Sequence, residues 1–252
     1  MGQYYLGWDV GGWHCSSASK SCDSLCLVGE DRGRKPSVKG SVFRGNVRVA
    51  FDSGDGEKLL AALLRLCQFE TSASIRLTIA IDACLGWPDD FMRLLSGEKV
   101  LLPGDMKKSN PFLLRETERF LYDHGHRPLS AVQDMIGSQS TKAMLLIHRL
   151  RLSPSDTGFW KGSIGKADVE LFETYPAPCK KSNKASELYK KVMNVPKDMS
   201  QDQVDALYCA LIAWFFSKNR TALEQPRKGI KKAEGWIWVP KDCLKTKRMR
   251  KS

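Results

Sequence analysis

Two apolar segments that each end in an aspartate constrain the fold of this chain more than any other feature. Residues 4–10 form an apolar run that contains Asp9 near its end, and Gly11 and Gly12 follow at once. The β-branched run IRLTIAID ends at Asp82. Runs of this kind are typical of buried strands. We therefore expect a sheet that carries acids at the ends of neighbouring strands.

The rest of the chain predicts helices that alternate with further strands. Residues 22–30 and the alternating segment 46–52 are interpreted as the second and third strands. Residues 56–69 have helical spacing, with Ser53 or Asp55 as the N-cap. Helices are expected within 87–97, 111–125, 140–152, 186–193 and 200–219, and strands within 169–176 and 235–240. Three strands that can pair antiparallel, followed by α/β crossovers, predict an α/β fold with a mixed sheet flanked by helices.

The composition is that of an ordinary globular protein, and the length of 252 residues fits one large domain or two small ones. The chain has no convincing linker, and we expect a single domain over 1–240, an irregular insertion over 97–110 and a basic tail over 241–252. An apolar run of about 18 residues, which a membrane-spanning helix needs, is absent from the sequence, and the N-terminus lacks the pattern of a secretory signal. Eight scattered cysteines without a C-x-x-C pair favour reduced, buried thiols and a cytoplasmic location.

Positive charge favours an anionic partner. The formal net charge is +12, and the basic residues gather in four groups along the chain. Each group alone is equally well explained as a solvated surface, but four together favour contacts with a phosphate backbone. Trp87 follows the second acid strand closely, so it is a candidate for base stacking, although core packing is the commoner role of tryptophan. The candidates for nucleic-acid binding are Lys180, Lys181, Lys184, Arg227, Lys228 and Trp87.

Two further acids stand in apolar surroundings. Glu173 ends the expected strand VELFE, and Asp205 lies in the helix DQVDALYCALIAW, three residues after Asp202. An ionised carboxylate buried without a partner costs several kcal/mol. Salt bridges to basic residues would compensate these acids, and a divalent cation would do so more economically. Without a cation, clustered carboxylates would raise one another's pKa. Carboxylate oxygens suit Mg²⁺ or Mn²⁺, and one or two such ions would activate a water molecule against a phosphodiester.

Each acid also has a purely structural interpretation. Asp9 before two glycines would form a turn, and Asp82 would cap the segment that follows it. Glu173 would form a salt bridge at a strand end, and Asp202 would interact with the helix dipole. Asp205 is the hardest to explain in this way, because the residues after it are apolar.

The order of these motifs resembles a known family. GWDVGG, IAIDACLGWP, RETERFL, FETYPA, DQVDALYCALIAW and GWIWVP occur in that order over almost the whole chain. They are similar to the domain of unknown function 429 family, whose members are predicted nucleases of the ribonuclease H-like superfamily. The resemblance implies a three-layer ribonuclease H-like fold with a mixed five-stranded central sheet flanked by helices and with a helical insertion. It also implies a metal site formed by Asp9, Asp82 and Asp205, and it adds Arg115, Glu118 and Glu173 as residues that face the site. Cys84 departs from the proline expected after the Asp82–Ala83 pair.

Three functions remain open from the sequence. The first is a Mg²⁺- or Mn²⁺-dependent nuclease in which Asp9, Asp82 and Asp205 hold the ions and Glu173 is a further ligand or orients water. The second is a nucleic-acid-binding module without chemistry, which would gain nothing from acids that face phosphates. The third is a phosphotransferase of the actin-like type, in which the Gly11–Gly12 loop would cradle a phosphate through backbone N–H groups.

Overall fold

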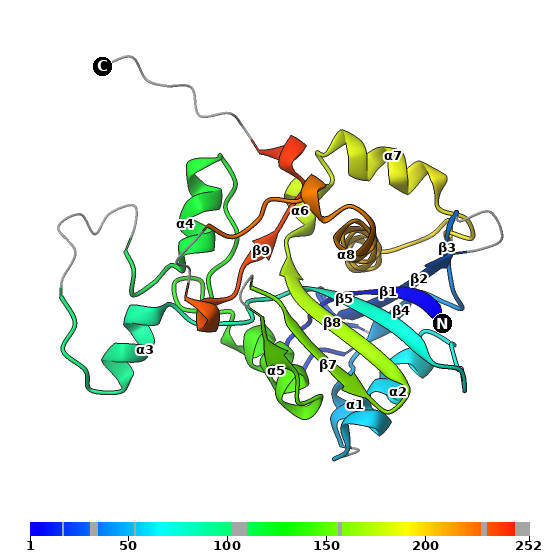
Figure 1. Cartoon of the computed structure of the whole chain (residues 1–252), viewed down its shortest axis with the longest axis horizontal. Helices are drawn as coiled ribbons and strands as arrows, with labels where there is room; N and C mark the ends of the chain where they lie inside the picture. Colours follow the sequence, from blue (N-terminus) through cyan, green and yellow to red (C-terminus); the bar gives the residue numbers. More distant parts are fainter. Residues whose placement is uncertain are drawn as a thin grey trace.

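The computed structural model describes residues 1–16, 18–30, 35–52, 54–101, 110–155, 158–227 and 231–244. One mixed sheet has helices on both of its faces (Figure 1). The strands are β1 (Gly2–Asp9), β2 (Asp23–Glu30), β3 (Pro36–Val38), β4 (Phe43–Gly45), β5 (Ile75–Asp82), β6 (Ser153–Pro154), β7 (Trp160–Ile164), β8 (Ala167–Thr174) and β9 (Ile237–Trp238). The helices are α1 (Arg48–Phe51), α2 (Gly56–Leu66), α3 (Asp89–Leu95), α4 (Glu116–Asp123), α5 (Gly137–Arg149), α6 (Pro176–Cys179), α7 (Asn183–Lys191) and α8 (Gln201–Lys218).

The sheet has the order β3-β2-β1-β5-β8-β7-β6. At its centre β1, β5 and β8 run parallel, and β2 and β7 pair antiparallel on either side. The short strands β4 and β9 pair with β2 and β8. The expected mixed α/β sheet is confirmed, but the expected number of five strands is wrong, because the described residues form nine.

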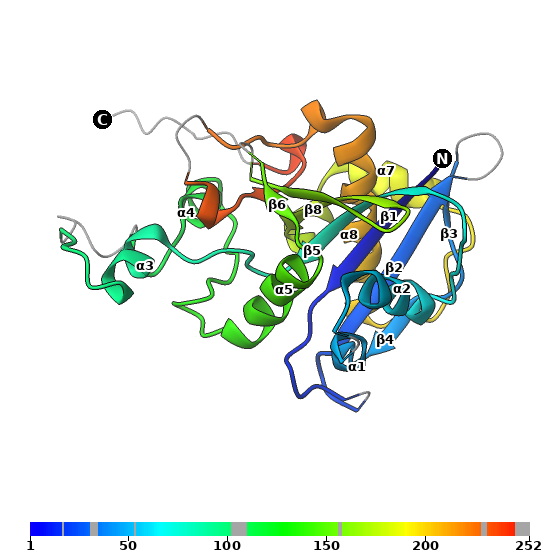
Figure 2. The same cartoon turned by 60° about the horizontal axis from the view of Figure 1, so that its bottom comes forward.

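Alternation along the strands places a core on each face of the sheet. On β1, Leu6 and Trp8 face the core that α1, α2 and α5 cover, whereas Tyr5 faces the core beneath α8. Figures 1 and 2 show α8 on one side of the sheet and α1, α2 and α5 on the other. The helix α8 also contacts α6 and α7, which explains why its sequence is apolar nearly all round.

A glycine sets how closely α8 approaches the sheet. A Cβ atom at Gly7 would lie 1.9 Å from the carbonyl oxygen of Ala206 and 2.4 Å from the backbone nitrogen of Ala210. Any larger residue would push the helix away from β1. Because Asp9 follows Gly7 by two residues and Asp205 precedes Ala206, this close packing also sets the distance between two candidate site residues.

Some expected elements are wrong. Residues 46–52 were expected as a strand, but α1 occupies Arg48–Phe51, where Asn46 accepts a hydrogen bond from the backbone N–H of Arg48 at 2.8 Å. The strand β4 lies just before this segment. The edge strands β3 and β6 and the strand β7, which lies between β8 and β6, were missed because their sequences are short or contain Gly or Pro. The helix expected over 111–125 is shorter, since α4 begins at Glu116. The cap at Asp55 is confirmed, and Ser53 lies outside the described residues.

The segments outside the sheet pack onto its two ends. The helices α3 and α4 project to one side in Figure 1. That they are an insertion into a ribonuclease H-like fold stays a prediction. Most of 97–110 lies outside the described residues. The tail was expected to begin at residue 241, but Lys241–Cys243 forms a short helical turn whose Cys243 is buried. Residues 245–252 lie outside the described part of the chain.

All eight cysteines are free thiols, and seven of them are buried, as expected from their apolar surroundings. Within the described ranges, the structure contains no helix that is long and apolar enough to span a membrane.

Candidate carboxylate site

Two aspartates lie side by side where the central parallel strands end. Asp9 of β1 and Asp82 of β5 are paired in the sheet register. Both line a cavity of about 190 Å³, together with Glu173 and with loop residues such as Leu129 and Gln139. The carboxylates of Asp9 and Asp82 receive no hydrogen bond or ion pair from any residue that the structure describes. Their negative charge is therefore the least compensated at this end of the sheet.

Burial and the neighbouring carboxylates raise the pKa values of both aspartates. Burial, followed by the charges of Asp82 and Asp205, raises the pKa of Asp9 to about 9. Burial, Asp205 and Glu173 raise the pKa of Asp82 to about 8, and the ammonium group of Lys180 opposes them. A carboxyl group in such surroundings either takes up a proton or requires a cation. The repulsion among clustered acids expected from the sequence is thus present in the fold.

Asp205 approaches this pair from α8. Its acidic neighbour Asp202 and Asp205 itself both contribute to the raised pKa of Asp9. One oxygen of Asp205 forms an ion pair with Lys180, and the other accepts a hydrogen bond from Nε2 of Gln201 at 2.9 Å. Asp9, Asp82 and Asp205, which the sequence placed in one site, are therefore brought within electrostatic reach of one another. Asp205 differs from the other two because both of its oxygens are occupied.

The donor set has the chemistry of a site for a hard divalent cation, but its geometry is incomplete. Three carboxylates supply oxygen ligands, and two of them have no other partner among the described residues, which fits Mg²⁺ or Mn²⁺. In the part of the chain that is described, however, no three His, Cys, Asp or Glu side chains are already gathered in a metal-binding arrangement. Asp205 would have to release Lys180 or Gln201 to join Asp9 and Asp82.

Glu173, in contrast, has both a cation and a backbone donor as partners, and the attraction of Arg115 opposes the burial that raises its pKa. Its two oxygens accept hydrogen bonds at 2.7 Å from Nη1 and Nη2 of Arg115, and Oε2 accepts a third from the backbone N–H of Leu85 at 3.0 Å. Glu118 accepts from Nε of the same arginine at 2.9 Å, and all three charged side chains are buried. Arg115, Glu118 and Glu173 thus form the salt-bridge network that was the structural alternative for Glu173. A role for Glu173 as a ligand would require it to give up this arginine.

Asp202 also has a structural role. It accepts a hydrogen bond from the backbone N–H of Cys22 at 3.1 Å and one from Nε of Arg44 at 3.0 Å. These contacts tie the start of α8 to the loop before β2 and to β4. Asp202 therefore acts on the site through its charge and through the position of α8.

A second buried ion pair was missed by the sequence analysis. Asp23, the first residue of β2, is fully buried and accepts a hydrogen bond from Nζ of Lys142 on α5 at 2.7 Å. It also accepts from the backbone N–H groups of Gly11 and Val47, at 2.9 and 3.0 Å. These bonds hold the glycine loop that follows Asp9. The only sequence signal was an acid at the start of an apolar strand and a lysine within an amphipathic helix.

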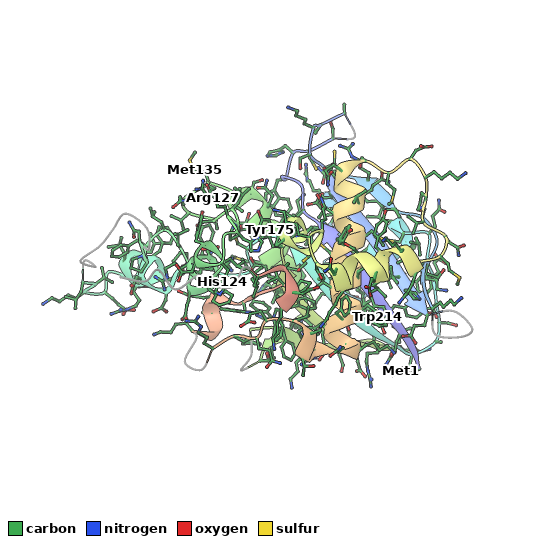
Figure 3. All side chains as sticks on the ribbon, turned by 90° about the horizontal axis from the view of Figure 1, so that it is seen from above. Met1, His124, Arg127, Met135, Tyr175 and Trp214 are labelled. Carbon is green, nitrogen blue, oxygen red and sulfur yellow. The ribbon has the colours of Figure 1, made fainter. Side chains whose placement is uncertain are left out.

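Tyr175 is another residue that sequence reasoning missed. It follows β8, lines the cavity and donates a hydrogen bond from its hydroxyl group to the carbonyl oxygen of Arg127 at 3.0 Å. Burial, followed by the charge of Asp82, raises its pKa. Figure 3 shows Tyr175 and Arg127 on the side of α4, whereas Trp214 marks the far end of α8. Beside Tyr175, the cavity is bordered by Pro128, Leu129 and Ile136, which lie between α4 and α5.

The candidates for nucleic-acid binding fall into two groups. Lys180 and Lys181 follow α6, Lys184 lies in α7, and Lys181 and Lys184 are exposed. Lys180 pairs with Asp205, whereas the backbone N–H of Lys184 donates to Asp242 at 3.1 Å. Arg227 lies over the ring of Phe120, 5.1 Å from its centroid. Trp87 packs against Phe91 with a centroid distance of 5.9 Å and does not line the carboxylate cavity. Lys228 lies outside the described residues.

Comparison of the chain with family models, with curated proteins and with solved structures finds no match.

Proposed function

We propose that this chain is a divalent-cation-dependent hydrolase that cleaves phosphodiester bonds of nucleic acid. One observation carries the proposal: Asp9 and Asp82 stand in register at the ends of adjacent parallel strands, in one cavity, without a donor among the described residues. Acids left in this state lower the stability of the protein unless a ligand compensates them. A ligand with positive charge is therefore part of the function.

The three aspartates would hold the ion, and Asp205 would join the other two by releasing Lys180. A bound Mg²⁺ or Mn²⁺ ion lowers the pKa of a water molecule and stabilises the charge that develops on a leaving oxygen. The position of the acids on the first strand, on its parallel neighbour and on the long helix is the arrangement that the resemblance to ribonuclease H-like nucleases implies. A net charge of +12, with Lys181 and Lys184 exposed close in the chain to Lys180, supports a polyanionic substrate.

The size of the cavity favours a phosphate of a polymer over a free nucleotide. At about 190 Å³ it is smaller than the pockets of about 300–1,000 Å³ that enclose drug-sized ligands. A backbone phosphate would reach the acids from the surface while its sugar and base remain outside. The same comparison disfavours an actin-like phosphotransferase, which has to enclose a nucleotide.

The loop after β1 gives a second reason to disfavour the phosphotransferase as the function of this chain. A phosphate cradle requires free backbone N–H groups. Here the N–H of Gly11 donates to Asp23, and the N–H of Trp13 donates to the hydroxyl oxygen of Ser138 at 3.0 Å. A binding module without chemistry remains the main alternative, but it offers no reason for two adjacent carboxylates that lack donors.

A cleavage assay tests the proposal. The purified protein is incubated with labelled single-stranded DNA, duplex DNA, RNA, an RNA–DNA hybrid and a four-way junction, with Mg²⁺, Mn²⁺ or EDTA. Asp82→Asn and Asp205→Asn are compared with Asp168→Asn, a matched change of an exposed aspartate on β8, which pairs with Arg76 far from the site. We expect metal-dependent cleavage that the first two changes abolish and the third retains. Binding of these substrates without cleavage under any condition would favour the binding module.

A further inference from the structure

The ion pair between Lys180 and Asp205 explains why the carboxylates are not gathered into a ready-made metal site. Lys180 contacts one oxygen of Asp205 and Gln201 contacts the other. The same ammonium group lowers the pKa of Asp82, which burial, Asp205 and Glu173 raise. Lys180 thus supplies positive charge to two of the three aspartates proposed as ligands.

The position of Lys180 combines a fixed backbone with a movable side chain. It directly follows the short helix α6, and its backbone N–H donates to the carbonyl oxygen of Pro176 at 3.0 Å. The preceding Cys179 is fully buried. The side chain of Lys180 nevertheless retains 30% of its exposure, against 19% for Asp205. Its amino group is therefore able to leave Asp205 for the surface without any change in the fold.

We propose that Lys180 is a built-in counter-ion that a divalent cation displaces from Asp205, after which its ammonium group binds a phosphate of the substrate. The inference rests on the proposed function, because it assigns a role within the same site. An ion of charge +2 neutralises three carboxylates better than one ammonium group does. Once released, Lys180 lies beside Lys181 and Lys184, on the surface suited to a phosphate backbone.

The need to displace Lys180 lowers the affinity for the metal ion by a measurable amount. A partly exposed ion pair contributes little to stability, so competition from Lys180 lowers the affinity for the ion by about fivefold. It also couples the ion to the substrate, since the lysine is available to a phosphate only when the ion is bound. Removing Lys180 is therefore expected to strengthen the binding of metal and to weaken the metal-dependent part of nucleic-acid binding.

The first experiment measures Mn²⁺ binding to the full chain by isothermal titration calorimetry. We expect Lys180→Met to bind Mn²⁺ about fivefold more tightly than the natural sequence. Lys58→Met is the matched control, because this substitution removes the same charge. Lys58 is exposed on α2, on the opposite face of the sheet. Equal or weaker Mn²⁺ binding by Lys180→Met, or an equal gain in Lys58→Met, would overturn the inference, as would the absence of Mn²⁺ binding in all three proteins.

The second experiment measures the release of the lysine. A fluorescein-labelled single-stranded DNA 20-mer is titrated in EDTA and in Ca²⁺, which occupies oxygen sites without supporting rapid cleavage. Lys180→Met is expected to lower DNA affinity about threefold to tenfold in Ca²⁺ and to leave it nearly unchanged in EDTA, since Lys180 is then held by Asp205. The same loss in both buffers would show that Lys180 is an ordinary surface contact and would contradict the displacement.

The two proposals fail separately. If Lys180→Met binds Mn²⁺ more tightly and no protein cleaves nucleic acid, the counter-ion role stands and the nuclease proposal fails. If the natural sequence cleaves nucleic acid and Lys180→Met binds Mn²⁺ as the natural sequence does, the nuclease stands and the displacement is wrong.

Discussion

Two groups of buried acids meet at the same end of the sheet, and they differ in compensation. Glu118 and Glu173 share the guanidinium group of Arg115, with hydrogen bonds of 2.7 to 2.9 Å. Asp9 and Asp82 have no donor among the described residues and carry raised pKa values. The first group is a complete salt-bridge network, whereas the second is compensated by protons or, in our proposal, by a cation. Charge compensation, rather than burial, separates a structural acid from a candidate functional one.

Removing the arginine that Glu118 and Glu173 share should give the largest loss of stability among the substitutions. Arg115→Met leaves Glu118 and Glu173 buried without a cation, so we expect it to lower the free energy of unfolding by about 3–5 kcal/mol. Urea denaturation followed by tryptophan fluorescence measures this loss. Arg119→Met, on the same helix but partly exposed, is the control and should cost less than about 1 kcal/mol. A loss for Arg115→Met as small as that of its control would remove the distinction between the two groups.

The next effect concerns the close packing of α8 on β1, which sets the distance between Asp205 and Asp9. Gly7→Ala places a Cβ atom 1.9 Å from the Ala206 carbonyl oxygen, so α8 has to move away from β1. We expect a loss of about 2–3 kcal/mol in unfolding free energy, together with weaker Mn²⁺ binding. Gly137→Ala is the control, because its Cβ would meet only the Trp87 ring at 3.6 Å. Unchanged Mn²⁺ affinity in Gly7→Ala would mean that Asp205 does not belong to the ion site.

Replacing a carboxylate by its amide should change the stability in opposite directions in the two groups. In EDTA at pH 8, Asp82→Asn is expected to stabilise the protein by about 1–2 kcal/mol, because it removes a carboxylate that its neighbours repel. Glu173→Gln is expected to destabilise it by about 2–3 kcal/mol, because it leaves Arg115 with one partner fewer. Chemical denaturation of both variants gives the comparison directly. Destabilisation by Asp82→Asn would indicate that a hidden donor satisfies this residue.

The last comparison is the pH dependence of the metal-free protein. The pKa is raised to about 9 for Asp9 and to about 8 for Asp82, against about 4 in an unfolded chain. The folded state therefore binds protons more tightly, and this contribution to stability is fully present below about pH 4 and is lost as the pH rises through about 8–9. We expect urea midpoints in EDTA to fall from about pH 6 to about pH 9, and this slope to flatten in the Asp9→Asn, Asp82→Asn double variant. An equal slope in that variant would place the titrating groups elsewhere.

Much of the fold was predictable because local patterns carry it. The strands β1, β2, β5 and β8 and the helices α2, α5 and α8 follow from apolar runs and helical spacing. The short edge strands were not predictable from the sequence. A strand of three residues such as β3 exists only through its pairing with β2. The segment that became α1 shows the same limit, since its alternation suits a strand and its packing beside α2 decides for a helix.

The sequence by itself determined that Asp9, Asp82 and Asp205 need compensation, because each stands among apolar residues where an unpaired charge is costly. Only the tertiary structure decided which acids receive it. Arg115 reaches Glu173 across 58 positions of the chain and Lys142 reaches Asp23 across 119, separations at which no local pattern indicates a pair. Only the fold shows that Lys180 pairs with Asp205 and that Asp9 and Asp82 lack a donor among the described residues, because compensation depends on distances in space and not on positions in the sequence.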